Sequence, residues 1–208
     1  MDSLSQEGKG ENKITEVNTF PVPISLGEIN EKIIVTTNTP YKLSKKQLLN
    51  QAFKFHSQGN ISEAVKYYQQ FIDQGFEDHI VFSNYGIILK NIGKLQEAEL
   101  FIRKAIELNP DLAMLHSNLG NIFVDLGDLQ EAEKSLRKAI KLNPNLTEAH
   151  YNLGNILKDL GNLQEAEISY RKAIKLNPDF AEAHSNLGNI LNDLGNLQEA
   201  ELSLRKAI

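Results

Sequence analysis

The sequence repeats itself every 34 residues, and this period constrains the fold more than any other feature. Prolines, glycines and alanines return at a fixed offset in successive stretches: Pro110, Pro144 and Pro178; Gly86, Gly120, Gly154 and Gly188; Ala98, Ala132, Ala166 and Ala200. A period of this length with a helical pattern is typical of an array in which each unit is a pair of helices. Such a chain folds by stacking copies of one unit, and it usually presents a long concave surface to a partner.

The repeat array is predicted over residues 43–208, and a non-repeating arm precedes it over residues 1–42. The array divides into the copies 45–78, 79–112, 113–146, 147–180 and a truncated 181–208, numbered 1 to 5 below. The start of the arm mixes polar residues with few apolar groups, which cannot offset the entropy lost on ordering. We therefore expect the arm to be mostly disordered, or to dock on copy 1.

Copy 3 shows the unit. Apolar residues with the spacing of one helix face predict a first helix, helix A, over residues 114–126. Gly127 ends this helix, because glycine adopts the left-handed conformation without a Cβ penalty, and Asp128 caps the next one. Helix B is predicted over residues 129–142. Pro144 ends it, because proline lacks the N–H group and disfavours helical backbone in the residue before it.

Small residues at fixed places in the unit predict close helix packing. Gly120 lies inside helix A, where glycine costs roughly 1 kcal/mol relative to alanine. A helix tolerates that cost when another helix must pass close by. Gly120 and Ala132 are therefore predicted to let helices A and B of one copy approach each other. Ala139 is predicted to admit helix A of the next copy.

These small residues also carry a resemblance. One glycine in helix A, two alanines in helix B and a closing proline mark the tetratricopeptide motif, and they stand at Gly120, Ala132, Ala139 and Pro144, then at Gly154, Ala166, Ala173 and Pro178. Residues 45–208 thus resemble tetratricopeptide repeat (TPR) arrays, such as those of O-linked N-acetylglucosamine transferase and of bacterial proteins. The resemblance implies an all-α, right-handed solenoid of stacked antiparallel helix-turn-helix units, with helix A lining the concave groove. Copy 1 departs from the motif, since Phe71 replaces the second alanine.

Composition excludes several classes of function. The formal net charge of −5 gives no footprint for nucleic acid. The absence of cysteine excludes disulfides, cysteine nucleophiles and zinc fingers. No secretory signal and no run long enough to span a membrane are visible in the sequence. We expect a cytoplasmic protein without a nucleic-acid or membrane partner.

No catalytic residue, metal site or cofactor is predicted. His116, His150 and His184 recur with the repeat, but equivalent residues of stacked copies are separated by roughly the 8–10 Å between packed helices. They cannot share a metal ion, whose ligands lie within about 2.1 Å of one point. A packing and hydrogen-bonding role early in helix A is favoured instead. Gly86 and Gly93-Lys94 lack the spacing of a phosphate-binding loop.

Two series of asparagines on helix A are the candidate binding residues. The first series is Asn84, Asn118, Asn152 and Asn186, with Asn50 at the same offset, and the second is Asn121, Asn155 and Asn189. The series are three residues apart, so they share one face of the helix. An amide offers both a donor and an acceptor, which suits a peptide backbone whatever its side chains. In the transferase arrays that this chain resembles, asparagines of the first series form a ladder that holds an extended polypeptide. The alternative is that these amides only solvate an empty groove.

The predicted function is that of a protein-interaction scaffold, which binds a polypeptide segment in the concave groove of residues 79–193. Two other functions were weighed against it. The array could instead be the targeting or substrate-recruiting arm of a glycosyl-, sulfo- or methyltransferase whose catalytic domain is absent from this sequence. RNA binding by a helical-repeat code needs a basic groove, and Asp125, Asp159 and Asp193 argue against it.

Two further expectations concern partners. Members of the family that grip chaperone tails use cationic residues on helix A, and Leu49, Phe53 and Met114 stand at the matching positions. Binding of a chaperone tail is therefore disfavoured. The last copy stops inside helix B, before the Leu-Asn-Pro that closes the others. Leu197, Leu204 and Ile208 are then expected to lie uncovered, which would favour self-association through this end.

Overall fold

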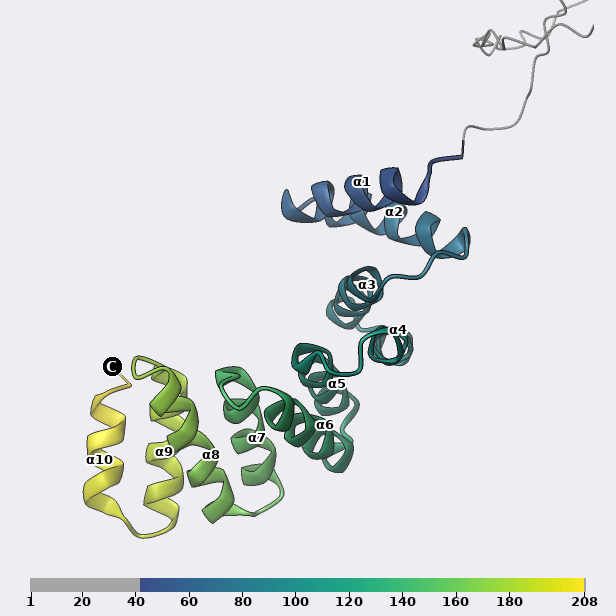
Figure 1. Cartoon of the computed structure of the whole chain (residues 1–208). Helices are drawn as coiled ribbons and strands as arrows, with labels where there is room; N and C mark the ends of the chain where they lie inside the picture. Colours follow the sequence, from purple (N-terminus) through teal and green to yellow (C-terminus); the bar gives the residue numbers. More distant parts are fainter. Residues whose placement is uncertain (1–41, 208) are drawn as a thin grey trace, which may run out of the picture. The chain divides into compact units, whose positions relative to one another are not determined.

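Ten helices and no strand make up residues 42–207, the part of the chain that the computed structural model describes (Figure 1). Their bounds are Lys45–Ser57 (α1), Ile61–Asp73 (α2), His79–Asn91 (α3), Leu95–Leu108 (α4), Ala113–Leu126 (α5), Leu129–Leu142 (α6), Thr147–Asp159 (α7), Leu163–Leu176 (α8), Ala181–Asp193 (α9) and Leu197–Arg205 (α10). The prediction of an all-α chain is confirmed. The arm predicted over residues 1–42 lies outside the described residues, apart from Lys42.

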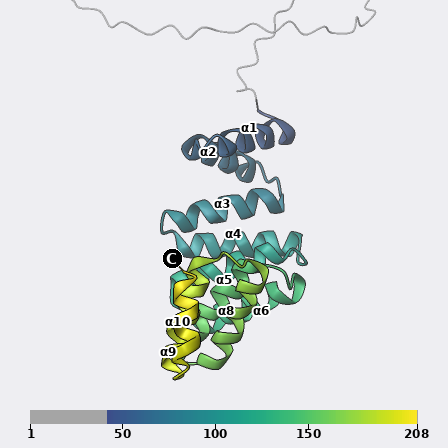
Figure 2. The same cartoon turned by 90° about the vertical axis from the view of Figure 1, so that its left-hand side faces the viewer.

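The helices pack in chain order as antiparallel pairs. Within each copy helix A packs on helix B, and in copies 2 to 5 helix A also packs on helix B of the copy before, as α5 does on α4. Helices A of neighbouring copies touch as well, since α3 contacts α5 and α5 contacts α7. Figure 1 shows the pairs following one another, and Figure 2 shows the first two pairs, α1 with α2 and α3 with α4, in the same order. The fold is therefore an α-solenoid, with helices A forming one of its faces.

Local signals set the helix ends in copy 3. Gly127 follows α5 with a φ of 80°, in the left-handed region that the sequence predicted for it. The Asp128 side chain then accepts a hydrogen bond from the backbone N–H of Glu131 at 3.2 Å and caps α6. At the other end, α6 stops at Leu142, one residue before the Asn143-Pro144 turn. The end of α5 and both ends of α6 thus follow from single residues, as expected, whereas Leu112 before α5 makes no side-chain cap.

The helical glycines permit close contact between helices A and B. A Cβ atom on Gly120 would lie 2.8 Å from Leu136 Cγ, and one on Gly154 would lie 2.6 Å from Cε1 of the Tyr170 ring. Both distances are shorter than a normal contact between carbon atoms. Ala132 and Ala139 are fully buried at the neighbouring contacts. The predicted role of the small residues in helix packing therefore agrees with the structure.

Phe71 changes the junction between copies 1 and 2. Its fully buried ring stands where the later copies have Ala105, Ala139 and Ala173. The ring packs on Phe76 at 5.4 Å between centroids, and the Lys45 ammonium lies 5.6 Å from its centroid. A phenyl ring fills the space that alanine leaves for the next helix. Consistent with this, α3 touches α2 at fewer places than the later A helices touch the preceding B helices.

Candidate functional site

Asparagine amides link successive copies along the helix A face. Asn152 Nδ2 donates to Asn121 Oδ1 at 2.8 Å, and Asn186 Nδ2 donates to Asn155 Oδ1 at 2.9 Å. In each pair a first-series asparagine binds a second-series asparagine of the preceding copy, 31 residues earlier. We call these two hydrogen bonds the amide rungs. The sequence predicted a shared face for the two series, but it did not predict this bond between copies.

Two tyrosines, the fully buried Tyr170 and the half-buried Tyr151, hold part of this network in place. Tyr170 OH donates to Asn155 Oδ1 at 2.8 Å, and Asn186 Nδ2 also reaches Tyr151 OH at 3.2 Å. Burial raises the pKa of the Tyr170 hydroxyl well above its ordinary value, because the phenolate would lose its water. Tyr170 therefore stays protonated and can donate. Asn155 Oδ1 already accepts two hydrogen bonds, so this oxygen has no free lone pair for a ligand.

The other candidate asparagines have different surroundings. Asn84 Nδ2 donates to Tyr68 OH at 3.2 Å. Asn118 is half-buried and makes no side-chain hydrogen bond with a described residue, because Ile87 stands where a second-series asparagine would accept its amide. Asn189 is exposed and likewise makes no such bond within residues 42–207. Asn118 and Asn189 thus present complete amides to solvent.

A hollow of about 230 Å³ lies between helices A of three successive copies. Its lining comes from α3, α5 and α7: Lys90; Asn121, Val124 and Asp125; Asn152, Asn155, Ile156 and Asp159. Lys90 Nζ lies 2.9 Å from Asp125 Oδ2, so this pair bridges copies 2 and 3 across the hollow. Five of the lining residues carry apolar or amide side chains, and two of these, Asn121 and Asn152, form the first amide rung. The hollow therefore combines hydrogen-bonding groups with apolar surface, as binding sites usually do.

The repeated histidines share one structural hydrogen bond, made through Nε2. Nε2 of His116, His150 and His184 lies 2.8, 2.9 and 2.8 Å from the carbonyl oxygen of Pro110, Pro144 and Pro178, respectively. Each ring thus closes the turn that precedes its helix, which is the hydrogen-bonding role predicted from the sequence. Within residues 42–207 no three His, Cys, Asp or Glu side chains are grouped so that they could hold a metal ion. No helix in that range is both long and apolar enough to cross a membrane.

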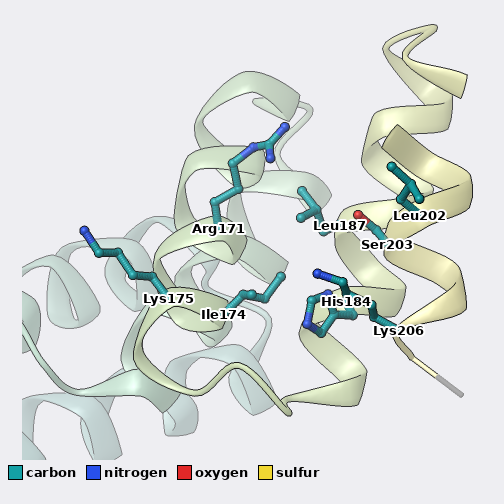
Figure 3. Close-up of a pocket in the computed structure, with 8 residues that line it drawn as sticks. All are labelled: Arg171, Ile174, Lys175, His184, Leu187, Leu202, Ser203 and Lys206. Atoms are coloured by element: carbon teal, nitrogen blue, oxygen red, sulfur yellow. The ribbon is translucent and has the colours of Figure 1, made fainter. Parts of the chain in front are cut away.

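A second hollow, of about 300 Å³, lies away from the amide rungs, among α8, α9 and α10 (Figure 3). Its lining is Arg171, Ile174 and Lys175 from α8, His184 and Leu187 from α9, and Leu202, Ser203 and Lys206 from the end of α10. We call it the α8–α10 pocket. Sequence reasoning did not find it, because its residues come from three helices and follow no motif.

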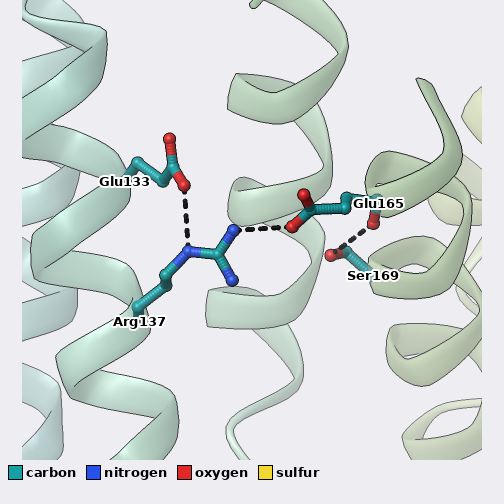
Figure 4. Close-up of polar contacts among 4 residues, drawn as sticks. All are labelled: Glu133, Arg137, Glu165 and Ser169. Atoms are coloured by element: carbon teal, nitrogen blue, oxygen red, sulfur yellow. Dashed lines mark hydrogen bonds and ion pairs between the residues drawn. The ribbon is translucent and has the colours of Figure 1, made fainter. Parts of the chain in front are cut away.

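Ion pairs cover the exposed surface of the B helices. Pairs four residues apart recur within the B helices, with Arg137 Nε 2.9 Å from Glu133 Oε1 and equivalent bonds in the copies around it. Arg137 also reaches Glu165 of the next copy, with Nη2 2.7 Å from Oε2 (Figure 4). Arg171 repeats this arrangement with Glu199. These bonds between copies, 28 residues apart, were not predicted.

Family models support the repeat assignment. A model described as TPR repeat matches residues 120–161 and 154–195, and one described as Tetratricopeptide repeat matches residues 81–112. The matched stretches together cover just over half of the chain. No curated protein sequence matches the chain.

Solved structures share the fold. A crystal structure of MamA has 23% sequence identity to this chain and a TM-score of 0.70. The match covers 78% of this chain and 89% of the MamA chain. MamA from Desulfovibrio magneticus RS-1 is 22% identical with a TM-score of 0.71, covering 78% and 92%. YrrB, described as a TPR protein with an unusual peptide-binding site, is 25% identical with a TM-score of 0.67, covering 79% and 85%.

Proposed function

This chain belongs to the tetratricopeptide repeat family, and on that premise we propose that it is a protein-interaction scaffold that binds an extended segment of a partner along the helix A face. The observation that carries the proposal is the hollow lined by α3, α5 and α7, with an amide rung inside it. A segment lying across three helices A would run along the array. The description of YrrB as peptide-binding agrees with such a role.

The amides around the hollow retain hydrogen-bonding capacity after forming their rung. Asn152 uses one N–H in the rung and keeps its oxygen and a second N–H, and Asn121 keeps both of its N–H groups. Asn118, which lies three residues before Asn121 on α5 and outside the lining of the hollow, keeps its whole amide. These groups can pair with the N–H and C=O groups of an extended backbone. Because the rung already orders Asn121 and Asn152, binding loses less side-chain entropy than free amides would.

The test starts from a display library of random peptides selected on the full chain. The triple variant Asn118→Ala, Asn152→Ala and Asn186→Ala should weaken a selected peptide by roughly tenfold or more, since each lost hydrogen bond is worth about 0.5–1.5 kcal/mol. Binding should depend only modestly on salt, because amides rather than ion pairs carry it. The helical circular dichroism signal should remain.

The matched control changes asparagines outside this face. Asn162 and Asn196 precede α8 and α10, and neither makes a side-chain capping bond. Asn162→Ala with Asn196→Ala should leave peptide affinity within about twofold, as expected for surface changes. If selected peptides bind the triple variant as tightly as they bind the parent chain, the groove proposal is wrong.

A scaffold of this kind needs no catalytic group of its own. The other predicted role, a recruiting arm of a transferase, stays a prediction, because the family models match repeat segments alone.

A further inference from the structure

The α8–α10 pocket contains a buried nitrogen without a partner. His184 is 5% exposed, and its Nε2 lies 2.8 Å from the Pro178 carbonyl oxygen. A carbonyl oxygen only accepts, so Nε2 carries the ring proton, and Nδ1 of the neutral ring is an acceptor. Within residues 42–207, His184 Nδ1 is the one buried side-chain nitrogen or oxygen that has no hydrogen-bond partner. A buried polar group left unpaired is unfavourable, so a donor supplied by a ligand would be stabilised at this nitrogen.

The charges around the pocket favour an anion. Lys175 and Lys206 form no ion pair with a described residue, and both are exposed. Arg171 is already held by Glu167 and Glu199, at 2.9 and 2.5 Å, so its charge is compensated. The free positive charge therefore belongs to the two lysines, one on α8 and one just beyond α10.

The floor of the pocket is apolar. Ile174, Leu187 and Leu202 line it, and Leu202 is 61% exposed. Figure 3 places Lys206 beside His184, whereas Lys175 extends outward from α8. A free inorganic anion would leave this apolar surface uncovered. A ligand that fits must supply a negative charge, an apolar group and a hydrogen-bond donor.

We propose that the α8–α10 pocket binds an acidic peptide segment in which an apolar side chain lies next to an acidic one. The carboxylate pairs with Lys206, Lys175 adds positive charge at the edge of the pocket, and the apolar side chain packs on Ile174, Leu187 and Leu202. As the carboxylate draws the flexible Lys206 side chain outward, Nδ1 of His184 becomes accessible to a backbone N–H of the peptide. This site is separate from the helix A face, so its success or failure leaves the proposed function untouched.

The experiment uses the full chain and the capped tripeptide N-acetyl-Glu-Leu-Glu amide at physiological salt. Long-range ¹H–¹⁵N spectra of the histidine rings report each ring nitrogen separately. The Nδ1 resonance of His184 should shift as the peptide is added, while that of His150, the equivalent ring one copy earlier, should stay in place. The neutral analogue N-acetyl-Gln-Leu-Gln amide should bind at least about fivefold more weakly, because it lacks the charge that Lys175 and Lys206 attract.

Repeat symmetry supplies the matched control. The double variant Lys175→Ala with Lys206→Ala should lower the affinity for the acidic peptide at least about fivefold. The double variant Lys141→Ala with Lys172→Ala, at the same positions one copy earlier, should change that affinity by less than about twofold. If the alanine pair perturbs folding, Lys175→Gln with Lys206→Gln carries the same test. If the two double variants lose peptide affinity equally, the attraction comes from general surface charge and the proposal is overturned. A His184 resonance that does not move, or that already shows a hydrogen bond to Nδ1 in the free chain, would also overturn it.

Discussion

Replacing Gly154 by alanine tests whether close contact between helices limits this array. Gly154 lies in α7 against the Tyr170 ring of α8, and an added Cβ would stand 2.6 Å from Cε1 and 2.7 Å from Cδ1. The ring cannot easily move away, because Tyr170 is fully buried and its hydroxyl binds Asn155. Gly154→Ala should therefore strain the packing and loosen the hydrogen bond that holds an amide rung.

Two opposing effects set the size of the change. Alanine in a helix interior is favoured over glycine by roughly 1 kcal/mol. Forcing an extra carbon into a packed contact costs about 1–3 kcal/mol. The net result for Gly154→Ala should be a loss of up to about 2 kcal/mol in the free energy of unfolding.

Gly188→Ala is the control with similar geometry and a movable neighbour. Its Cβ would lie 2.6 Å from Leu204 Cγ, but Leu204 is 38% exposed and can rotate toward solvent. This variant should keep or raise stability by up to about 1 kcal/mol, because the helix preference for alanine prevails. Urea unfolding followed by circular dichroism measures both variants. If Gly154→Ala is as stable as Gly188→Ala, the contact between α7 and α8 is not close enough to matter.

Three further changes probe the packing, the titration and the surface charge. Ala166→Leu in α8 should cost about 1–3 kcal/mol by overpacking, because Ala166 is fully buried, and an unchanged urea midpoint would refute this. The pKa of Tyr170 is higher in the folded state than in the unfolded state, where it is near 10. Protonated Tyr170 therefore stabilises the folded state fully below about pH 10, and this stabilisation is lost as the pH rises through the folded pKa. Above about pH 10 the free energy of unfolding should thus fall less steeply with pH in Tyr170→Phe than in the parent chain. Arg137→Ala should cost less than about 1 kcal/mol although it removes the bonds to Glu133 and Glu165, because the pairs are exposed, and thermal unfolding at two salt concentrations checks this.

Most of the fold follows from signals inside one repeat unit. Gly127 and Pro144 set helix ends, and Gly120 and Ala132 mark the contact between α5 and α6. These signals are local or act between neighbouring helices of one hairpin. They are therefore readable from residue type and spacing alone.

The side-chain contacts between copies were harder to predict. The bond from Asn152 to Asn121 depends on how far helix A of one copy is shifted along helix A of the copy before, and packing sets that shift. The period gives the spacing of equivalent residues, but the rungs join residues that are not equivalent. Ile87 then leaves Asn118 without an acceptor, and this follows only once the offset of 31 residues is known.

The consequence of Phe71 was also missed in part. The sequence showed that Phe71 replaces an alanine in copy 1, but its effect depends on where the ring goes. The ring is buried against Phe76, at the place where the next helix would otherwise approach. Residue size alone could not decide between this position and one turned toward solvent.

Side-chain amide resonances of the asparagines test the central claim most directly. A display-selected peptide is added to the ¹⁵N-labelled full chain, and the Nδ2 signals are followed one by one. The account predicts that the signals of Asn118, Asn121 and Asn152 shift together, while those of Asn162 and Asn196 do not. If the bound peptide leaves the Nδ2 signals of these three groove asparagines unmoved and shifts only backbone amide signals of the B helices, binding along the helix A face is contradicted.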